Sequence, residues 1–144
     1  MKLRFVISSL TLAAAVGCSS YTPVPVASGE ICFRCAKSIV DSRMAGEVID
    51  TKGRAFKFRT AGCMAKYLKV NAKDAAAVFV TDYASGRLVK PTAVTFVPVV
   101  VTEGYTKTTD YLAFSSTAAA KEAAARERST LVEWKQVLEA ATAN

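Results

Sequence analysis

The sequence predicts an α+β fold made of two small ββαβ-type halves, with mainly antiparallel sheets and short helices. Runs that alternate apolar and polar residues indicate strands with one buried face. An N-capping threonine and an alanine-rich run indicate helices between these strands. In chain order the elements read ββαβ and then ββαβα. We therefore expect two halves, at about residues 30–85 and 86–142.

A β-hairpin is expected at the start of the first half. Residues 47–50 and 54–59 flank the turn Thr51-Lys52-Gly53, and a glycine-containing turn between two strand-like runs is typical of a hairpin. Strand alternation predicts that Phe56 and Phe58 face the core, and that the basic side chains at positions 57 and 59 face solvent.

A short helix should follow this hairpin, over residues 61–70, with Thr60 as its N-cap. Cys63 and Met64 would then lie in the first turn. The free N–H groups and the partial positive charge at a helix N-terminus lower the pKa of a thiol. The pattern therefore places Cys63 where a thiolate forms readily.

The remaining elements follow from the same rules. A buried strand is expected over residues 75–83, and Pro98 predicts an edge strand, a bulge or two shorter strands within residues 88–102. The other expected elements are a polar loop at 105–109, a strand at 110–115, a helix at 117–128, a strand at 130–134 and a helix at 135–141.

The N-terminus has the features of a lipoprotein signal peptide. A basic start at residues 1–4 and an apolar run at 5–16 precede Ala15-Val16-Gly17-Cys18, which looks like a bacterial lipobox. We expect cleavage after residue 17 and acylation of Cys18, with more than one acyl chain for durable anchoring. The alternative is an ordinary secretory signal in which Cys18 has no special role.

The residues after Cys18 suggest where the protein is anchored. Position 19 is serine rather than aspartate, which in a Gram-negative host favours the outer membrane over the inner membrane. Residues 18–29, rich in Pro, Ser and Gly, are expected to form a lipidated flexible tether. The folded domain would then cover residues 30–142 and face the periplasm.

Composition excludes several function classes. The chain of 144 residues contains no histidine, which removes His-based catalysis and mixed Cys/His metal sites. Its net charge of +7 comes from scattered bases without interleaved aromatic residues, so we expect no nucleic-acid binding. Asp41, Asp82 and Glu103 are interpreted as structural or solvated groups, and no enzyme activity is expected.

Three cysteines, Cys32, Cys35 and Cys63, remain if Cys18 carries lipid. An odd number in an exported protein means that they cannot all pair internally. Cys32 and Cys35 fit half of a zinc site, a thiol–disulfide pair, or a soft site for Cu(I), which favours thiolate and thioether ligands. A structural disulfide, Cys32–Cys35 or Cys35–Cys63, is a further alternative. Met64 and Met44 are candidate thioether ligands.

A family resemblance favours the copper alternative. The run Cys32-x-x-Cys35-Ala36-Lys37-x-Ile39-x-Asp41-x-Arg43 resembles the C-G-M-x-I-x-D-x-R stretch of the NosL family, copper-binding lipoproteins that accompany nitrous-oxide reductase. The similarity continues at Gly62-Cys63-Met64-x-x-Tyr67 and covers most of residues 31–138 through the runs at 80–83, 112–116 and 132–134. It implies two ββαβ-type halves, a lipid anchor and delivery of Cu(I) to an apo-metalloenzyme.

The sequence departs from the family pattern where Ala36 and Lys37 replace its glycine and methionine. Lysine is no Cu(I) ligand, but its charge would help to keep Cys35 as a thiolate. We therefore expect a periplasm-facing metallochaperone that binds Cu(I) through Cys35 with Cys32 and Cys63. Its partners would be the membrane, through the lipid anchor, and an apo-metalloenzyme or a copper transporter. The rival functions are thiol–disulfide exchange by Cys32 and Cys35, and a non-catalytic envelope lipoprotein.

Overall fold

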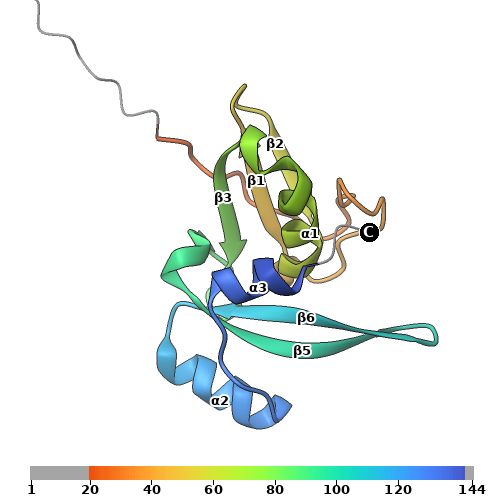
Figure 1. Cartoon of the computed structure of the whole chain (residues 1–144), viewed down its shortest axis with the longest axis vertical. Coiled ribbons are helices and arrows are strands. Elements are labelled where there is room, and N and C mark those ends of the chain that lie inside the picture. Colours follow the sequence, from red (N-terminus) through yellow and green to blue (C-terminus); the bar gives the residue numbers. More distant parts are fainter. Residues whose placement is uncertain (1–19, 142–144) are drawn as a thin grey trace, which may run out of the picture.

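The computed structural model describes residues 20–141, so the predicted signal peptide and Cys18 lie outside the described residues. Its helices and strands are β1 Gly46–Asp50, β2 Ala55–Phe58, α1 Ala61–Asn71, β3 Ala75–Thr81, β4 Leu88–Val89, β5 Thr95–Glu103, β6 Thr106–Phe114, α2 Thr117–Glu127 and α3 Trp134–Ala140. The predicted α+β class is confirmed (Figure 1). Among the helices of these residues, none combines the length and apolar character needed to cross a membrane.

Two antiparallel sheets form the framework. The first has four strands in the order β2-β1-β3-β4, and the second is the long hairpin of β5 and β6. A parallel bridge between Asp82 and Ala113 joins the two sheets. In Figure 1, α1 lies over the first sheet, α3 lies between this sheet and the β5–β6 hairpin, and α2 lies on the other side of the hairpin.

The hairpin of β1 and β2 forms as predicted, and Asp50 closes its turn. The carboxylate of Asp50 accepts hydrogen bonds from the backbone N–H groups of Lys52 (2.9 Å) and Arg54 (2.8 Å). Gly53 adopts a φ of 78°, a left-handed conformation that glycine takes without steric cost. Phe58 is buried, in agreement with the alternation of the strand.

The prediction that the basic side chains of Lys57 and Arg59 face solvent is wrong, because neither extends freely into solvent. Lys57 Nζ donates to Glu30 (2.7 Å) and to the backbone carbonyl of Pro25 (3.0 Å). Arg59 pairs with Glu103 at the end of β5. Segments distant in the sequence cover this face of β2, and strand alternation alone gives no information about such segments.

The structure also corrects the prediction of a flexible tether at residues 18–29, because its second half contacts the domain. The backbone N–H of Val24 donates to the buried carboxylate of Glu47 at 2.9 Å, and Val26 packs against the core. Gly29 N–H donates to the carbonyl of Ile39 at 2.8 Å. Residues 24–29 are therefore docked on the domain, although their composition is that of a linker.

The strands of the second half differ from the prediction in two places, at residues 106–109 and at residues 130–134. Residues 106–109, expected in a polar loop, belong to β6 and pair with the end of β5. The expected strand at 130–134 is reduced to a bridge between Val132 and Phe96. Pro98 lies within β5 opposite Tyr111, in a two-stranded sheet where the missing N–H can face away from the partner strand. The edge-strand alternative is thus confirmed.

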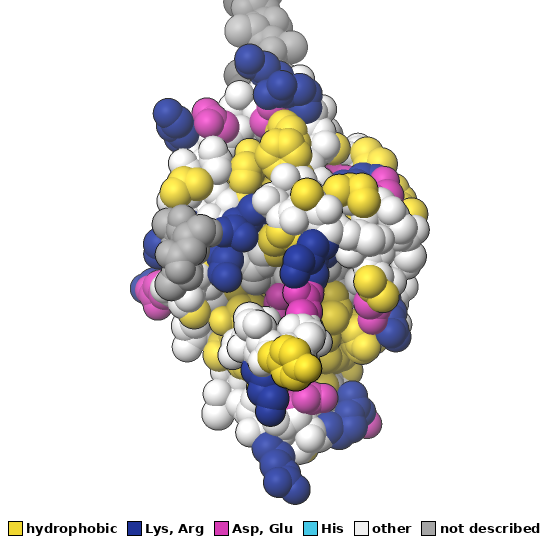
Figure 2. Space-filling model, turned by 90° about the vertical axis from the view of Figure 1, so that its right-hand side faces the viewer, with side chains coloured by type: hydrophobic (Ala, Val, Ile, Leu, Met, Phe, Trp, Pro, Cys, Tyr) yellow, Lys and Arg dark blue, Asp and Glu magenta, His cyan; other side chains and the backbone are white. Residues whose placement is uncertain are grey.

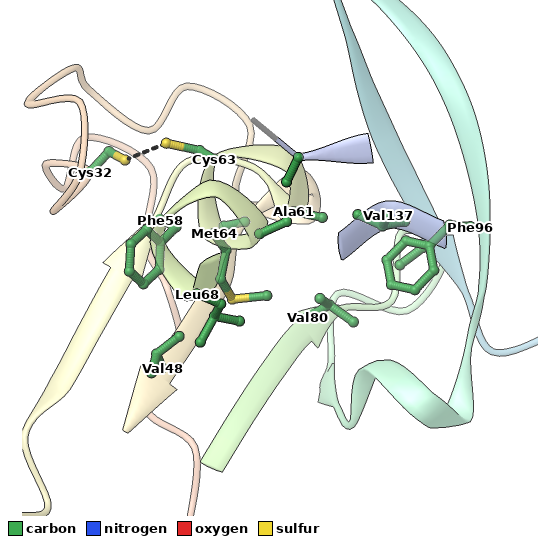
Figure 3. Packing of buried hydrophobic residues seen from close by; sticks show 14 of the residues in the cluster. Cys32, Val48, Phe58, Ala61, Cys63, Met64, Leu68, Val80, Phe96 and Val137 are labelled. Atoms are coloured by element: carbon green, nitrogen blue, oxygen red, sulfur yellow. Dashed lines mark hydrogen bonds between the residues drawn. The ribbon is translucent and has the colours of Figure 1, made fainter. Parts of the chain in front are cut away.

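Residues from both halves share the main hydrophobic core. Phe58, Met64 and Val80 of the first half pack in one cluster with Phe96 and Val137 of the second (Figure 3). Burying side chains of this size contributes about 1.5–3 kcal/mol each. A smaller cluster, which includes Val97, Leu112, Phe114, Ala120 and Ala123, holds α2 against the hairpin.

Replacing Glu47 by glutamine should stabilise the protein at neutral pH. Burial raises the pKa of this carboxyl above its ordinary value. A raised pKa in the folded state favours folding at low pH, and this contribution is lost as the pH rises through the folded pKa. Glutamine keeps an acceptor for Val24 N–H without the buried charge.

Urea unfolding of wild type and E47Q at several pH values tests this prediction. The advantage of E47Q should be largest near pH 7 and should shrink as the pH falls toward the ordinary glutamate pKa of about 4.3. An advantage independent of pH would contradict a buried, charged Glu47.

Candidate metal centre

Three cysteine side chains meet between the loop before β1 and the start of α1. The sulfur atoms of Cys32, Cys35 and Cys63 all lie within 4.8 Å of one another. Cys32 Sγ and Cys63 Sγ are 3.5 Å apart, and the dashed line in Figure 3 marks this contact. All three cysteines are free in the structure.

Backbone hydrogen bonds shape the loop that carries Cys32 and Cys35. Cys32 N–H donates to the carbonyl of Lys37, and Ala36 N–H donates to the carbonyl of Cys32, each at 2.9 Å. Ala36 has a φ of 55°, in the left-handed region that costs a non-glycine residue roughly 1–2 kcal/mol. This tight turn directs both cysteine side chains of the loop to the same place.

Phe33 attaches the loop to the first sheet. Its N–H donates to the carbonyl of Lys57 at 2.8 Å. Its ring lies 4.5 Å from the ring of Phe56 and 5.8 Å from that of Tyr67, between centroids. Aromatic contacts of this geometry contribute about 0.5–1.5 kcal/mol each beyond the area that they bury. Phe33, one of the two residues between the cysteines, is therefore the anchor of their loop.

The start of α1 positions Cys63, as predicted. The side chain of Thr60 caps the helix by accepting from Cys63 N–H at 3.1 Å. The next free N–H, that of Gly62, donates to the carboxylate of Asp110 at 3.0 Å. A Cβ on Gly62 would lie 2.9 Å from the Asp110 oxygen, so a larger residue here would push the Asp110 side chain away from the start of the helix.

The paired sulfurs titrate differently. The hydrogen bond between the two sulfurs, in which either thiol can be the donor, is the main reason why the pKa of Cys32 falls to about 4. The backbone N–H groups of Arg59 and Cys35 also lower it, whereas burial opposes them. The pKa of Cys63 is raised by the same hydrogen bond and by burial, which corrects the expectation that its thiolate forms readily at the start of α1. Within the pair, Cys32 is therefore the thiol that ionises first.

Cys35 is the accessible member of the group. Cys32 is only 1% exposed and Cys63 only 9%, whereas Cys35 is half-buried. Cys35 and Cys63 line a recess of about 140 Å³, which also contains Arg34, Lys37, Arg59, Lys66, Glu103 and Asp110. A ligand can therefore reach the cysteines from this side.

The two candidate methionine ligands lie apart from this arrangement. Met64 is fully buried in the main core, and its side chain points away from the cysteines in Figure 3. A Cβ on Gly46 would lie 2.7 Å from its sulfur, so the thioether packs against β1. Met44 packs against the smaller core cluster. The role of Met64 and Met44 as ligands stays a prediction. The three cysteines form a group of possible ligands without them.

Sequence reasoning did not identify three residues that shape the centre. Phe33 anchors the loop, Asp110 holds the start of α1, and Glu103 pairs with Lys37 and Arg59 beside the cysteines. The aromatic residue inside the Cys-x-x-Cys run was an available signal for Phe33. Nothing in the local sequence marks the other two, because each reaches the centre from the distant β5–β6 hairpin.

The structure thus defines an α+β domain with a group of three cysteines that can hold a metal ion. The crystal structure of the copper chaperone NosL from Shewanella denitrificans has the same fold, with a TM-score of 0.67 at 14% sequence identity. That match covers 87% of this chain and 99% of that chain. The resemblance noted in the sequence is confirmed at the level of the fold. No protein-family model and no curated protein sequence matches the chain.

Replacing Ala36 by glycine should stabilise the folded protein by about 1 kcal/mol, because glycine removes the steric cost of the left-handed conformation. Chemical denaturation under reducing conditions measures the change. Ala27 is the matched control: it has no positive φ, and A27G should be neutral or destabilising. A destabilised A36G would contradict the turn geometry described above.

Proposed function

We propose that this protein binds a soft metal ion, Cu(I), and serves as a metallochaperone or accessory factor in the maturation of a metalloenzyme. The observation that carries this proposal is the convergence of three cysteine sulfurs within 4.8 Å, in a chain that has no histidine. Cys35, Cys32 and Cys63 are the ligands. The structurally similar NosL from Shewanella denitrificans is a copper chaperone, which supports the same assignment.

The donor set favours Cu(I) over other metals. Thiolates are soft ligands that select Cu(I), zinc or iron–sulfur clusters. Structural zinc takes four ligands, whereas the group contains three cysteines, and the nearby Asp110 carboxylate is hydrogen-bonded to Gly62. With metal–sulfur bonds of about 2.3 Å, three thiolates around one ion lie about 4 Å apart. The spacing in this group agrees with that value.

Burial suggests how the metal would enter and leave. Cys32 is covered by protein and Cys63 is only slightly exposed at the recess, while Cys35 is the most accessible of the three. An incoming donor sulfur can therefore replace Cys35 first, and the metal then passes by stepwise ligand exchange. The Cys32 thiolate gives the ion a negatively charged ligand from the start.

The location is also a proposal. Acylation of Cys18 would anchor the protein in the outer membrane, with the domain facing the periplasm. The chain is fixed to the domain from Val24 onward. The six steps from Cys18 to Val24 span at most about 20 Å at ~3.4 Å per residue. The membrane would therefore hold the domain close to its surface, where an apo-metalloenzyme or a copper transporter could meet it.

Thiol–disulfide exchange is the second candidate function, because one observation favours it. Cys32 Sγ lies 3.5 Å from Cys63 Sγ, and its lowered pKa is typical of a nucleophilic thiol. However, a redox-active nucleophile is partly exposed, whereas Cys32 is buried. Metal binding makes better use of a buried thiolate.

Anaerobic titration of the reduced protein with Cu(I), against a competing chelator, tests the metal proposal. We expect one equivalent to bind tightly. C35S, C32S and C63S should each weaken binding by at least about 100-fold, since each removes one of three thiolates. Binding no tighter than that of the chelator would overturn the proposal.

The control for this titration is M64L. Leucine conserves the volume of methionine in the core at a cost of less than about 1.5 kcal/mol. It should leave Cu(I) affinity unchanged if the three cysteines suffice. A large loss of affinity in a folded M64L protein would make Met64 a ligand after all.

Replacing Cys18 by serine tests the anchor. Lipidation adds about 0.8 kcal/mol of membrane affinity for each buried methylene group, so C18S should abolish acyl labelling and lower the membrane-bound fraction. Fractionation of cells with metabolic acyl labelling measures both. Unchanged labelling of C18S would show that Cys18 is not the acylated residue.

A further inference from the structure

The recess beside the cysteines has an excess of positive charge. Four basic side chains line it, those of Arg34, Lys37, Arg59 and Lys66, together with two acidic ones, Glu103 and Asp110. Figure 2 shows Lys and Arg side chains near the middle of this face, with acidic side chains directly beside them. Because Asp110 is turned toward the start of α1, Glu103 is the acidic group that faces these cations.

Glu103 forms ion pairs with two of these basic side chains at once. One carboxylate oxygen pairs with Arg59 and the other with Lys37, which comes from the cysteine loop. Glu103 is the last residue of β5, so this contact holds the end of the β5–β6 hairpin beside the cysteines. The side chains of Lys37 and Glu103 are 58% and 36% exposed, so a competing carboxylate from solvent can reach both partners.

Exposed apolar side chains accompany these charges. Tyr105, two residues after Glu103 in the hairpin turn, is fully exposed, and Phe33 in the cysteine loop is 55% exposed. Aromatic and arginine side chains are enriched in protein interfaces, and charge complementarity guides the approach of a partner. The combination of cations, aromatic rings and an accessible Cys35 is that of a docking surface.

We infer that this cationic recess binds an acidic segment of the partner protein that exchanges metal with Cys35. In the absence of the partner, the Glu103 carboxylate occupies the position that the carboxylates of this segment take when they displace it. The inference rests on the proposed function for the identity of the partner as a metal donor or acceptor. The carboxylates of the segment take the place of Glu103 on Lys37 and Arg59. The hairpin end is then released from the cysteine loop at the moment when the partner's donor group arrives.

The shape of the surface favours a protein segment over a lipid surface. The cations line a recess rather than a plane, and a side chain that extends from a backbone can enter it. The ligand already present there is a carboxylate from an extended strand, at the end of a hairpin whose strands are otherwise fully paired. An acidic peptide in extended form presents the same group in the same way.

Peptide binding to the metal-free, reduced full-chain protein in nonionic detergent tests the inference. The probes are a short fluorescent glutamate-rich peptide and a matched peptide with glutamine in place of glutamate. We expect the glutamate peptide to bind preferentially at low ionic strength and to be released by salt. K37Q/K66Q should weaken binding about tenfold, because each lost charge contact is worth a few-fold in affinity.

Two control variants separate the recess from the overall charge. K90Q/K121Q removes the same charge at two exposed lysines away from the recess and should change binding less than twofold. E103Q should tighten binding about threefold, whereas E127Q, which changes the net charge equally at an exposed site on α2, should not.

Four outcomes would overturn the inference. These are equal binding of both peptides, equal weakening by the two lysine pairs, equal effects of E103Q and E127Q, and anionic phospholipid vesicles that bind through Lys37 and Lys66 and exclude the peptide. Cu(I) stoichiometry is measured separately on the same preparations. A protein that binds the peptide but no Cu(I) would contradict only the metal proposal, and the reverse result would contradict only the docking surface.

Discussion

The sulfur atoms of Cys32 and Cys63 meet because the edge strand β2 holds both of the segments that carry them. The cysteine loop hydrogen-bonds to β2 through Phe33 N–H, and Tyr67 of α1 packs on the rings of Phe58 and Phe33. The two cysteines are 31 positions apart in the chain. Without this aromatic layer the loop would have no fixed position relative to the helix, and the three thiols could not act as one ligand set.

Charge is distributed around this centre in two layers. Inside, the hydrogen bond with Cys63 and backbone N–H groups lower the pKa of the buried Cys32. Outside, basic side chains line the recess and Glu103 neutralises two of them. The inner layer favours binding of a soft cation, and the outer layer favours approach of an acidic protein. In the proposed function, the same electrostatic arrangement would serve both to hold the metal and to meet the partner.

The β5–β6 hairpin links the second half of the chain to the centre. Phe96 at its base packs in the main core with residues of the first half, Asp110 fixes the start of α1, and Glu103 pairs with the cysteine loop. The two halves thus depend on each other, and β4 of the second half is itself a strand of the first sheet. A hairpin fixed at its base and held at its end by exposed ion pairs can release that end without unfolding the core.

The sequence by itself determined the local elements and the type of chemistry. Alternation in residues 54–59 and the cap at Thr60 predicted the hairpin and α1, because strand and helix periods and capping are local properties. The absence of histidine and the three remaining cysteines left a soft-metal site among several alternatives, and the family resemblance favoured it before any geometry was known. The tether and the solvent-facing basic residues of β2 were mispredicted, because composition does not show which distant segment will cover a surface.

Only the tertiary structure decided which residues meet. It brought Cys63 to Cys32, placed Met64 in the core away from them, and set Glu103 against Lys37 and Arg59. These contacts join residues far apart in the chain, and they arise from the packing of whole elements on a shared core. Periodicity and spacing show which residues are neighbours within one helix or strand. They could therefore identify candidate sulfur ligands, but not which of these sulfurs meet in the folded protein.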